Sequence, residues 1–355
     1  MKSFSQIVLA FIVAFSFAAS GVADEPSAAK KEAKYLGNIR QVTKGFPRAG
    51  EGYFSPDGKS IVYQAYPIGY PFYQIYVQKL GNKPGEFPPR RISPGRGRTT
   101  CSYFSPDGKK ILFASAHTDP HPDITEFKAR QEALKGKRRR YQWAFDPHME
   151  IYVCDLNGTN MKRLTNSDGY DAEGSYSSDG KQIVFTSTRD GDPDIYVMNA
   201  DGSNVRQITN VDGYDGGPFF SPDDKWIIFR SDRKKEHMLQ LFAVSVDGKH
   251  TVQLTDNLNQ VNWCPYFHPS GKYLIWSGAD YSRGPRFAHF QLFTMETSWT
   301  DKTFKGGKIT QITFDKSADV LPVFSPDGKK LMWTSTRTKD GSSQLWIADW
   351  LRAKK

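Results

Sequence analysis

One short phrase occurs six times along the chain, and it constrains the fold more than any other feature. In each copy an aromatic residue leads into Ser-Pro-Asp-Gly-Lys or a close variant. The copies begin at Phe54, Phe104, Tyr176, Phe220, Phe267 and Phe324. Proline presets one turn dihedral, aspartate bonds its own backbone and glycine accepts a positive φ, so each copy predicts a tight turn. A run with strand character follows each turn, as in Ile183-Val-Phe-Thr186, and each copy is therefore a predicted β-hairpin.

The spacing of the copies indicates radial repetition. Successive copies lie 50, 72, 44, 47 and 57 residues apart, and a four-stranded propeller blade takes about 40 to 50 residues. The last copy has no fourth strand after it, but the run Ile39-Arg-Gln-Val-Thr43 stands at the front of the chain. We therefore predict an all-β, six-bladed β-propeller over residues 35–355, closed by the N-terminal strand in the last blade.

The first residues have the pattern of a secretory signal. A charged start and an apolar run from Ile7 to Ala19 precede a small-residue site, which predicts a signal peptide over 1–23 and a linker over 24–34. An uncleaved membrane anchor is the alternative. No later stretch reaches the ~18 apolar residues of a membrane span. We expect a periplasmic or secreted protein with no transmembrane span after cleavage.

The net charge limits the expected binding partners, and the cysteine content limits the expected disulfides. The net charge of +10 favours anionic surfaces, but no single-strand platform or helix-turn-helix pattern supports nucleic acid, which we exclude. The three cysteines, Cys101, Cys154 and Cys264, are too few and odd in number for a disulfide framework in an exported protein. We predict three buried thiols.

The long second step holds an insertion, residues 117–148, that distinguishes blade two. It contains a run of helical composition, Ile124 to Leu134, followed by the basic run Lys135 to Arg140. Because it joins the second and third strands of its blade, we expect a helical lid on the loop-rich face. Its imidazoles and carboxylates suit zinc or manganese, although hydrogen-bonded loop residues are the alternative and no cofactor is assigned. These candidates are His117, Asp119, His121, Asp123, Asp146 and His148.

Each blade has two candidate ligand-binding positions at the channel mouth, which stand five and three residues before the phrase aromatic. They should enter the innermost strand on the loop-rich face, where propeller loops carry function. The acidic members are Glu51, Asp171, Glu173, Asp215 and Asp319. The aspartates could instead cap loop amides. Arg189, Arg233 and Arg337 follow the second strands, and for them we predict salt bridges between blades.

The repeat resembles the TolB-type β-propeller repeat over Tyr35 to Leu351, and Leu164 to Thr209 matches it almost position by position. The residues before Tyr35 show no counterpart of the mixed α/β domain that precedes the propeller in TolB. Similar propeller lyases acting on uronic-acid oligosaccharides gather His and Gln around a metal at comparable loops, and this resemblance makes four residues candidates: His237, Gln240, His289 and Gln291. Because Gln, Glu or Asp fills the glutamine position in all six blades, a structural role in the repeat is the alternative.

Two function classes follow from these patterns. The first is a non-catalytic binding or scaffold module of the cell envelope, with an envelope protein, a peptide segment or a small polar ligand at the channel mouth. The alternative is a metal-assisted lyase or hydrolase of anionic carbohydrate, which would use the insertion histidines with His237 or His289.

Overall fold

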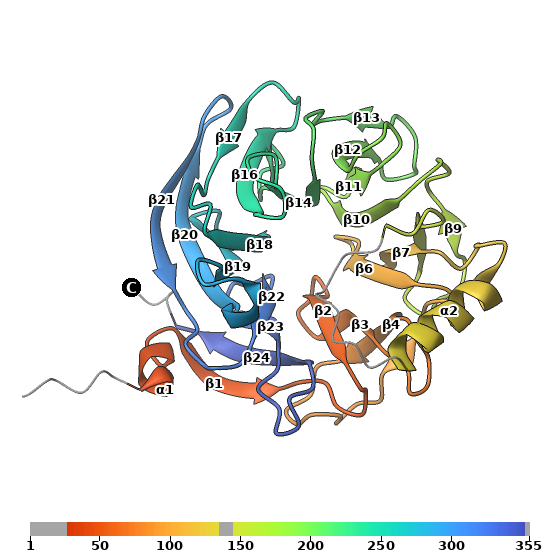
Figure 1. The fold of residues 1–355 in the computed structure, drawn as a ribbon, viewed down its shortest axis with the longest axis horizontal. Coiled ribbons are helices and arrows are strands. Elements are labelled where there is room, and N and C mark those ends of the chain that lie inside the picture. Colours follow the sequence, from red (N-terminus) through yellow and green to blue (C-terminus); the bar gives the residue numbers. More distant parts are fainter. Residues whose placement is uncertain (1–26, 135–144, 352–355) are drawn as a thin grey trace, which may run out of the picture.

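Six four-stranded antiparallel sheets surround a central axis in the computed structural model, which describes residues 27–134 and 145–351 (Figure 1). The predicted signal peptide and the basic run of the insertion lie outside the described residues. Blades one to five each run in chain order from the centre outward. The six-bladed all-β propeller predicted from the repeat is confirmed.

The innermost strand of each blade ends at the phrase aromatic. These strands are β2 (Ala49–Phe54), β6 (Thr99–Phe104), β10 (Asp171–Tyr176), β14 (Asp215–Phe220), β18 (Gln260–Phe267) and β22 (Asp319–Phe324). The second strands are β3 (Ser60–Ala65), β7 (Lys110–Ser115), β11 (Gln182–Ser187), β15 (Trp226–Ser231), β19 (Tyr273–Asp280) and β23 (Lys330–Ser335). The second strands carry most of the fully buried large side chains, including Trp226, Trp276 and Trp333. The core therefore lies in layers between neighbouring sheets.

The outermost strand is the shortest in most blades. The third strands are β4 (Gln74–Lys79), β8 (Glu150–Asp155), β12 (Asp194–Asn199), β16 (Gln240–Ser245), β20 (Gln291–Trp299) and β24 (Gln344–Trp350). The outermost are β5 (Arg90–Arg91), β9 (Lys162–Arg163), β13 (Arg206–Gln207), β17 (Thr251–Gln253), β21 (Phe304–Gln311) and β1 (Leu36–Gln41). In blade six, β1 pairs with β24 from Leu36 opposite Trp350 to Gln41 opposite Trp346. The N-terminal strand thus closes the ring, as predicted, and covers the edge of β24.

In all six phrases the amide of the residue before the lysine donates to the carbonyl of the residue after the aromatic, and in five of them serine and aspartate side chains add to the turn. In the first copy the Ser55 hydroxyl donates to Asp57 at 2.5 Å, Lys59 N donates to the same carboxylate at 3.0 Å, and Ser60 N donates to Ser55 Oγ at 2.9 Å. The remaining phrases lie at the same end of their inner strands, which defines the turn face of the molecule. The opposite end, with the links between blades, is the loop-rich face.

Three short helices interrupt the strands within the described residues. They are α1 (Ala28–Glu32), α2 (Pro122–Leu134) and the 3-10 turn η1 (Pro285–Phe287). Helix α1 lies in the segment expected to be a linker. Helix α2 lies toward the rim beside blades one and two, away from the central strands (Figure 1). No helix in the described part of the chain is long and apolar enough to cross a membrane.

Candidate channel site

A bulge in each innermost strand places one residue at the central cavity. The bulged residue stands three positions before the phrase aromatic and has a left-handed φ in all six blades. These angles are 46° at Glu51, 52° at Cys101, 58° at Glu173, 59° at Gly217, 54° at Cys264 and 57° at Leu321. The pairing register with the second strand shifts at this place in each blade. A left-handed conformation costs a non-glycine residue about 1–2 kcal/mol, so five residues carry backbone strain at one ring.

The bulge amides also join neighbouring blades. Glu51 N in blade one donates to Thr334 Oγ1 in blade six at 3.0 Å. Leu321 N in blade six donates to Ser277 Oγ in blade five at 3.0 Å. Since these two acceptors come from second strands, the bonds hold the bulges of blades one and six against the preceding sheet.

Arg230 of β15 is the cation at the centre of the ring. Its Nη2 donates to Glu173 Oε1 at 2.6 Å and to the Tyr214 hydroxyl at 2.7 Å, and its side chain is almost fully buried. Gly217 makes room for it, because a Cβ there would lie 1.9 Å from Arg230 Nη1. Gly217 N and the Thr186 hydroxyl donate to the other Glu173 oxygen at 2.7 and 2.9 Å. The buried ion pair is thus completed by hydrogen bonds from two further residues.

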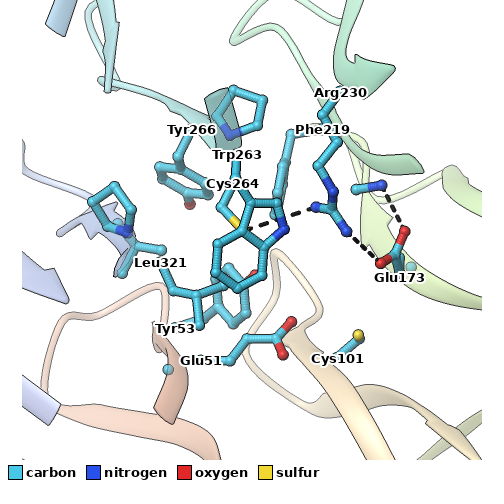
Figure 2. Close-up of a pocket in the computed structure, with 16 residues that line it drawn as sticks. Glu51, Tyr53, Cys101, Glu173, Phe219, Arg230, Trp263, Cys264, Tyr266 and Leu321 are labelled. Atoms are coloured by element: carbon cyan, nitrogen blue, oxygen red, sulfur yellow. Dashed lines mark hydrogen bonds and ion pairs between the residues drawn. The ribbon is translucent and has the colours of Figure 1, made fainter. Parts of the chain in front are cut away.

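Glu51 is a second carboxylate that lines the same cavity as Arg230 and Glu173 (Figure 2). Burial and then the charge of Glu173 raise the pKa of Glu51 to about 7, against the opposing effects of a Cys101 hydrogen bond and the Arg230 charge. One guanidinium cannot neutralise two carboxylates, so Glu51 takes up a proton more readily than a solvent-exposed glutamate. The site therefore holds a carboxyl group that titrates near neutral pH.

Four aromatic rings close the channel on the side of the turn face. Tyr53, Tyr103, Phe219 and Tyr266 come from blades one, two, four and five, and each stands one position before a phrase aromatic. The Tyr53 and Phe219 ring centroids are 5.9 Å apart, and the Tyr103 and Tyr266 hydroxyls are 3.1 Å apart. Because opposite blades meet here, these rings form an aromatic plug that fills the axis. The cavity above it has a volume of about 40 Å³, enough for two or three water molecules.

The cavity is also lined by two thiols and an indole. Cys101 and Cys264 face it from blades two and five, and Trp263 lies beside Arg230 with its ring centroid 5.8 Å from the guanidinium (Figure 2). All three cysteines of the chain are buried and free, which confirms the prediction of buried thiols. Burial raises the pKa of the Cys101 and Cys264 thiols well above the usual range. They are therefore poor nucleophiles in the folded chain.

The structure brings together only part of the predicted acidic mouth. Glu51 and Glu173 line the cavity, whereas Asp171, Asp215 and Asp319 are fully buried and point away from it into ion pairs. The partners of these aspartates are Arg189, Arg233 and Arg337. Each arginine follows the second strand of the same blade, so the prediction of salt bridges between blades is wrong. Each aspartate–arginine pair instead links the first strand of a blade to the residues that follow the second strand of the same blade.

His117 occupies in blade two the position of these arginines. Its Nδ1 lies 2.8 Å from Ser115 Oγ, just as Arg189 Nε lies 2.8 Å from Ser187 Oγ. Its ring packs on Tyr152 at 4.5 Å, as the Arg189 guanidinium packs on Tyr196 at 4.9 Å. Thr99 replaces the paired aspartate in this blade. A neutral imidazole fits where no carboxylate is present, and burial lowers the pKa of His117.

The other insertion candidates make local loop contacts. Asp119 accepts hydrogen bonds from His121 N and the Thr125 hydroxyl, both at 2.7 Å, and lies 3.7 Å from His148 Nε2. Asp146 accepts from His148 N at 3.1 Å. Asp123 lies 3.9 Å from Arg96.

His237 and His289 are exposed on loops of blades four and five. In the described residues, the one trio whose ligand atoms lie within 4.8 Å of one another is Asp190, Asp192 and Asp194, which contains none of the predicted ligands. The structure thus does not gather the histidines into one site.

The described part of the insertion does not lie over the channel. Helix α2 contacts the second-to-third loop of blade one, where Tyr70 donates to Glu126 Oε1 at 2.5 Å and Arg130 donates to Gly69 O at 2.7 Å. These contacts hold the helix toward the rim (Figure 1). The expectation of a helical lid is therefore wrong for α2, and Tyr70 serves its attachment.

Comparisons with known proteins agree with the fold. A model described as the TolB beta propeller domain matches residues 135–286. The Tol-Pal system protein TolB of Bordetella pertussis is 44% identical over 45 residues, which is 12% of this chain and 10% of that protein. A structure titled as a putative TolB from Agrobacterium tumefaciens covers 85% of this chain and 90% of its own, with 21% identity and a TM-score of 0.53. The chain is a TolB-like β-propeller.

The same architecture occurs in an enzyme. An oligogalacturonate lyase from Vibrio parahaemolyticus covers 88% of this chain and 96% of its own, with 12% identity and a TM-score of 0.50. At this identity the likeness concerns the fold alone. The function of the TolB-like propeller therefore has to be argued from its own site.

Sequence reasoning missed Arg230, Trp263 and the aromatic plug. Arg230 could have been found, because the second strands of the other five blades have an uncharged residue at the equivalent position. The plug residues also occupied a repeated position, directly before the phrase aromatic. Their neighbours across the axis come from opposite blades, and no local pattern reports that contact.

Proposed function

We propose that this TolB-like propeller is a non-catalytic binding module of the cell envelope, and that a partner protein presents a cationic group to the channel cavity. The observation that carries the proposal is the charge arrangement around Arg230. Two buried carboxylates, Glu51 and Glu173, line a cavity with one guanidinium, which pairs with Glu173, and burial makes ionisation of Glu51 costly. A cation from a partner would balance it and replace its proton.

The size of the cavity favours the tip of a side chain over a sugar ring. A volume of about 40 Å³ holds two or three waters, and the aromatic plug prevents deeper entry. A lysine ammonium is compact and displaces few waters, and the faces of Trp263 and Tyr53 can attract it. Arg230 Nε has no acceptor in the described residues, so it is available to a carbonyl of the same inserted segment. Together these features suit a polypeptide ligand.

An envelope location is part of the proposal. The signal-like residues 1–23 and the likeness to TolB support a periplasmic or secreted protein. The net charge of +10 places the acidic cavity within a basic molecule, so long-range attraction does not select a cationic partner. Selectivity would come from the cavity itself.

Titration with n-butylamine, which carries the terminal group of a lysine side chain, tests the chemistry of the cavity. We expect NMR shifts at the Trp263 indole and an association constant that rises about tenfold per pH unit below the Glu51 pKa of about 7 and levels off above it. Below that pKa, binding has to expel the carboxyl proton. Glu51→Gln, which mimics the protonated acid in shape, should abolish the pH dependence.

Asp57→Asn on the turn face is the matched control and should leave the titration unchanged. Pull-downs from envelope extracts with the same three proteins should show a partner that Glu51→Gln loses and Asp57→Asn retains. Butylamine binding that is equal in all three proteins would contradict the proposed site. Depolymerisation of oligogalacturonate at a rate that depends on Glu51 would contradict the non-catalytic function.

A further inference from the structure

A carboxylate from the N-terminal segment is seated on the loop-rich face of blade six. Glu32, the last residue of α1, is buried, and both of its oxygens accept from Arg337, at 2.8 Å each. Glu32 Oε1 also accepts from Phe314 N at 2.7 Å and Asp315 N at 3.0 Å. The Glu32 seat thus consists of a bidentate guanidinium and two successive amides of the link between blades five and six.

Blade three repeats the donors of this seat. Arg189 pairs with Asp171 as Arg337 pairs with Asp319. The links also run in the same register, because Tyr170 N donates to Thr188 Oγ1 at 2.8 Å and Ala318 N donates to Thr336 Oγ1 at 3.0 Å. Alignment on these two bonds places Asn166 and Ser167 where blade six has Phe314 and Asp315.

The blade-three seat is open. Within the described residues, Arg189 Nη1 and the backbone amides of Asn166 and Ser167 have no acceptor, whereas the blade-six equivalents bind Glu32. The Arg189 side chain is 24% exposed, against 10% for Arg337. Asn166 and Ser167 also line a polar surface pocket of about 290 Å³. A ligand can therefore reach these donors.

Blade four does not repeat the seat as well. Asp232 takes the place of Thr188 and accepts from Tyr214 N at 2.8 Å, so a second negative charge stands beside Arg233. Asp192 accepts from Gly213 N in the same link at 2.9 Å. A further carboxylate would be repelled there. Blade two has His117 in place of the arginine.

We propose that the blade-three seat binds a single glutamate or aspartate carboxylate from a polypeptide segment, with Arg189 and the amides of Asn166 and Ser167 as donors. The pocket beside it carries charges of both signs. Arg163 and Glu150 form an ion pair across it, and His148 and the exposed Asp168 face it. This site lies on the rim, apart from the channel cavity, and does not depend on what the cavity binds.

The occupant of blade six supplies the probe. An acetylated and amidated peptide of residues 27–34, which carries Glu32, is titrated into the full isotope-labelled chain. We expect saturable shifts of the Ser167 amide and the Arg189 side-chain N–H with a Kd on the order of 1 mM, typical of one charge-assisted contact without a larger interface. The same peptide with Glu32→Gln should bind at least tenfold more weakly.

Variants separate the site from a general charge effect. Arg189→Lys keeps the charge but loses the two-pronged geometry and should weaken binding at least tenfold, whereas Arg233→Lys in blade four should not. Because the mapping on the unmodified chain needs no variant, it decides the question even if Arg189→Lys is poorly folded. Shifts that spare Ser167 and Arg189, or equal binding of the glutamate and glutamine peptides, would overturn the proposal.

Discussion

The two ends of each inner strand both repeat six times, but they repeat in different ways. At the turn face the residues and the geometry recur together, since a serine hydroxyl donates to the aspartate two residues later in five of the six copies. At the bulge only the left-handed backbone recurs, while its residue is Glu, Cys, Glu, Gly, Cys or Leu. This propeller therefore repeats its scaffold in full and varies the residues that its bulges present to the axis.

The largest test of this contrast compares two glycines. Gly217→Ala at the bulge should lower the free energy of unfolding by about 3 kcal/mol, because its Cβ displaces Arg230 and leaves Glu173 as a buried charge without its partner. Gly58→Ala in the first turn, where φ is 68° and no atom lies within 4 Å of the added carbon, should cost only about 1 kcal/mol. Urea unfolding measures both. Equal losses would mean that the bulge ring does not depend on what its side chains contact.

A second test uses opposite pH dependences at the two ends. The folded chain raises the pKa of Glu51 from 4.5 to about 7, so the acid stabilises the fold below pH 4.5 and this contribution is lost as pH rises toward 7. The free energy of unfolding of the natural chain relative to Glu51→Gln should fall by about 3 kcal/mol over that window. Denaturant unfolding at pH 4.5, 6 and 7.5 measures it. If the difference in free energy of unfolding did not change with pH, Glu51 would be solvent-exposed in the folded chain.

The smallest expected effect lies in a single turn. Hydrogen bonds from Ser55 and Lys59 N hold the pKa of Asp57 below its usual value, so its contribution is present at neutral pH and lost as pH falls below about 3.8. Asp57→Ala should lower the free energy of unfolding by about 1 kcal/mol at pH 7, because it removes the side-chain hydrogen bonds of only one turn among six. Thermal unfolding at pH 7 and pH 3 should show the difference shrinking in acid. A loss as large as that of Gly217→Ala would mean that the turns are as sensitive to substitution as the bulges.

The bulge explains which site residues could be predicted. Residues three and five positions before the phrase aromatic enter the same end of the innermost strand, and in a regular strand they would also share one face. The extra residue of the bulge breaks this alternation. Glu51 and Glu173 consequently face the cavity, while Asp171, Asp215 and Asp319 turn into their own sheets. A left-handed backbone at a glutamate, cysteine or leucine has no signature in a single sequence.

The sequence by itself determined the blade number, the six turns and the strand that closes the ring, because turn chemistry and strand periodicity act between residues close in the chain. Tertiary structure alone decided the rest. Arg230, Glu173 and Glu51 line one cavity from three different blades, Tyr53 meets Phe219 across the axis, and Glu32 reaches Arg337 from the other end of the chain. Such contacts depend on how six sheets close around one axis, and closure is a property of the whole ring rather than of any one repeat.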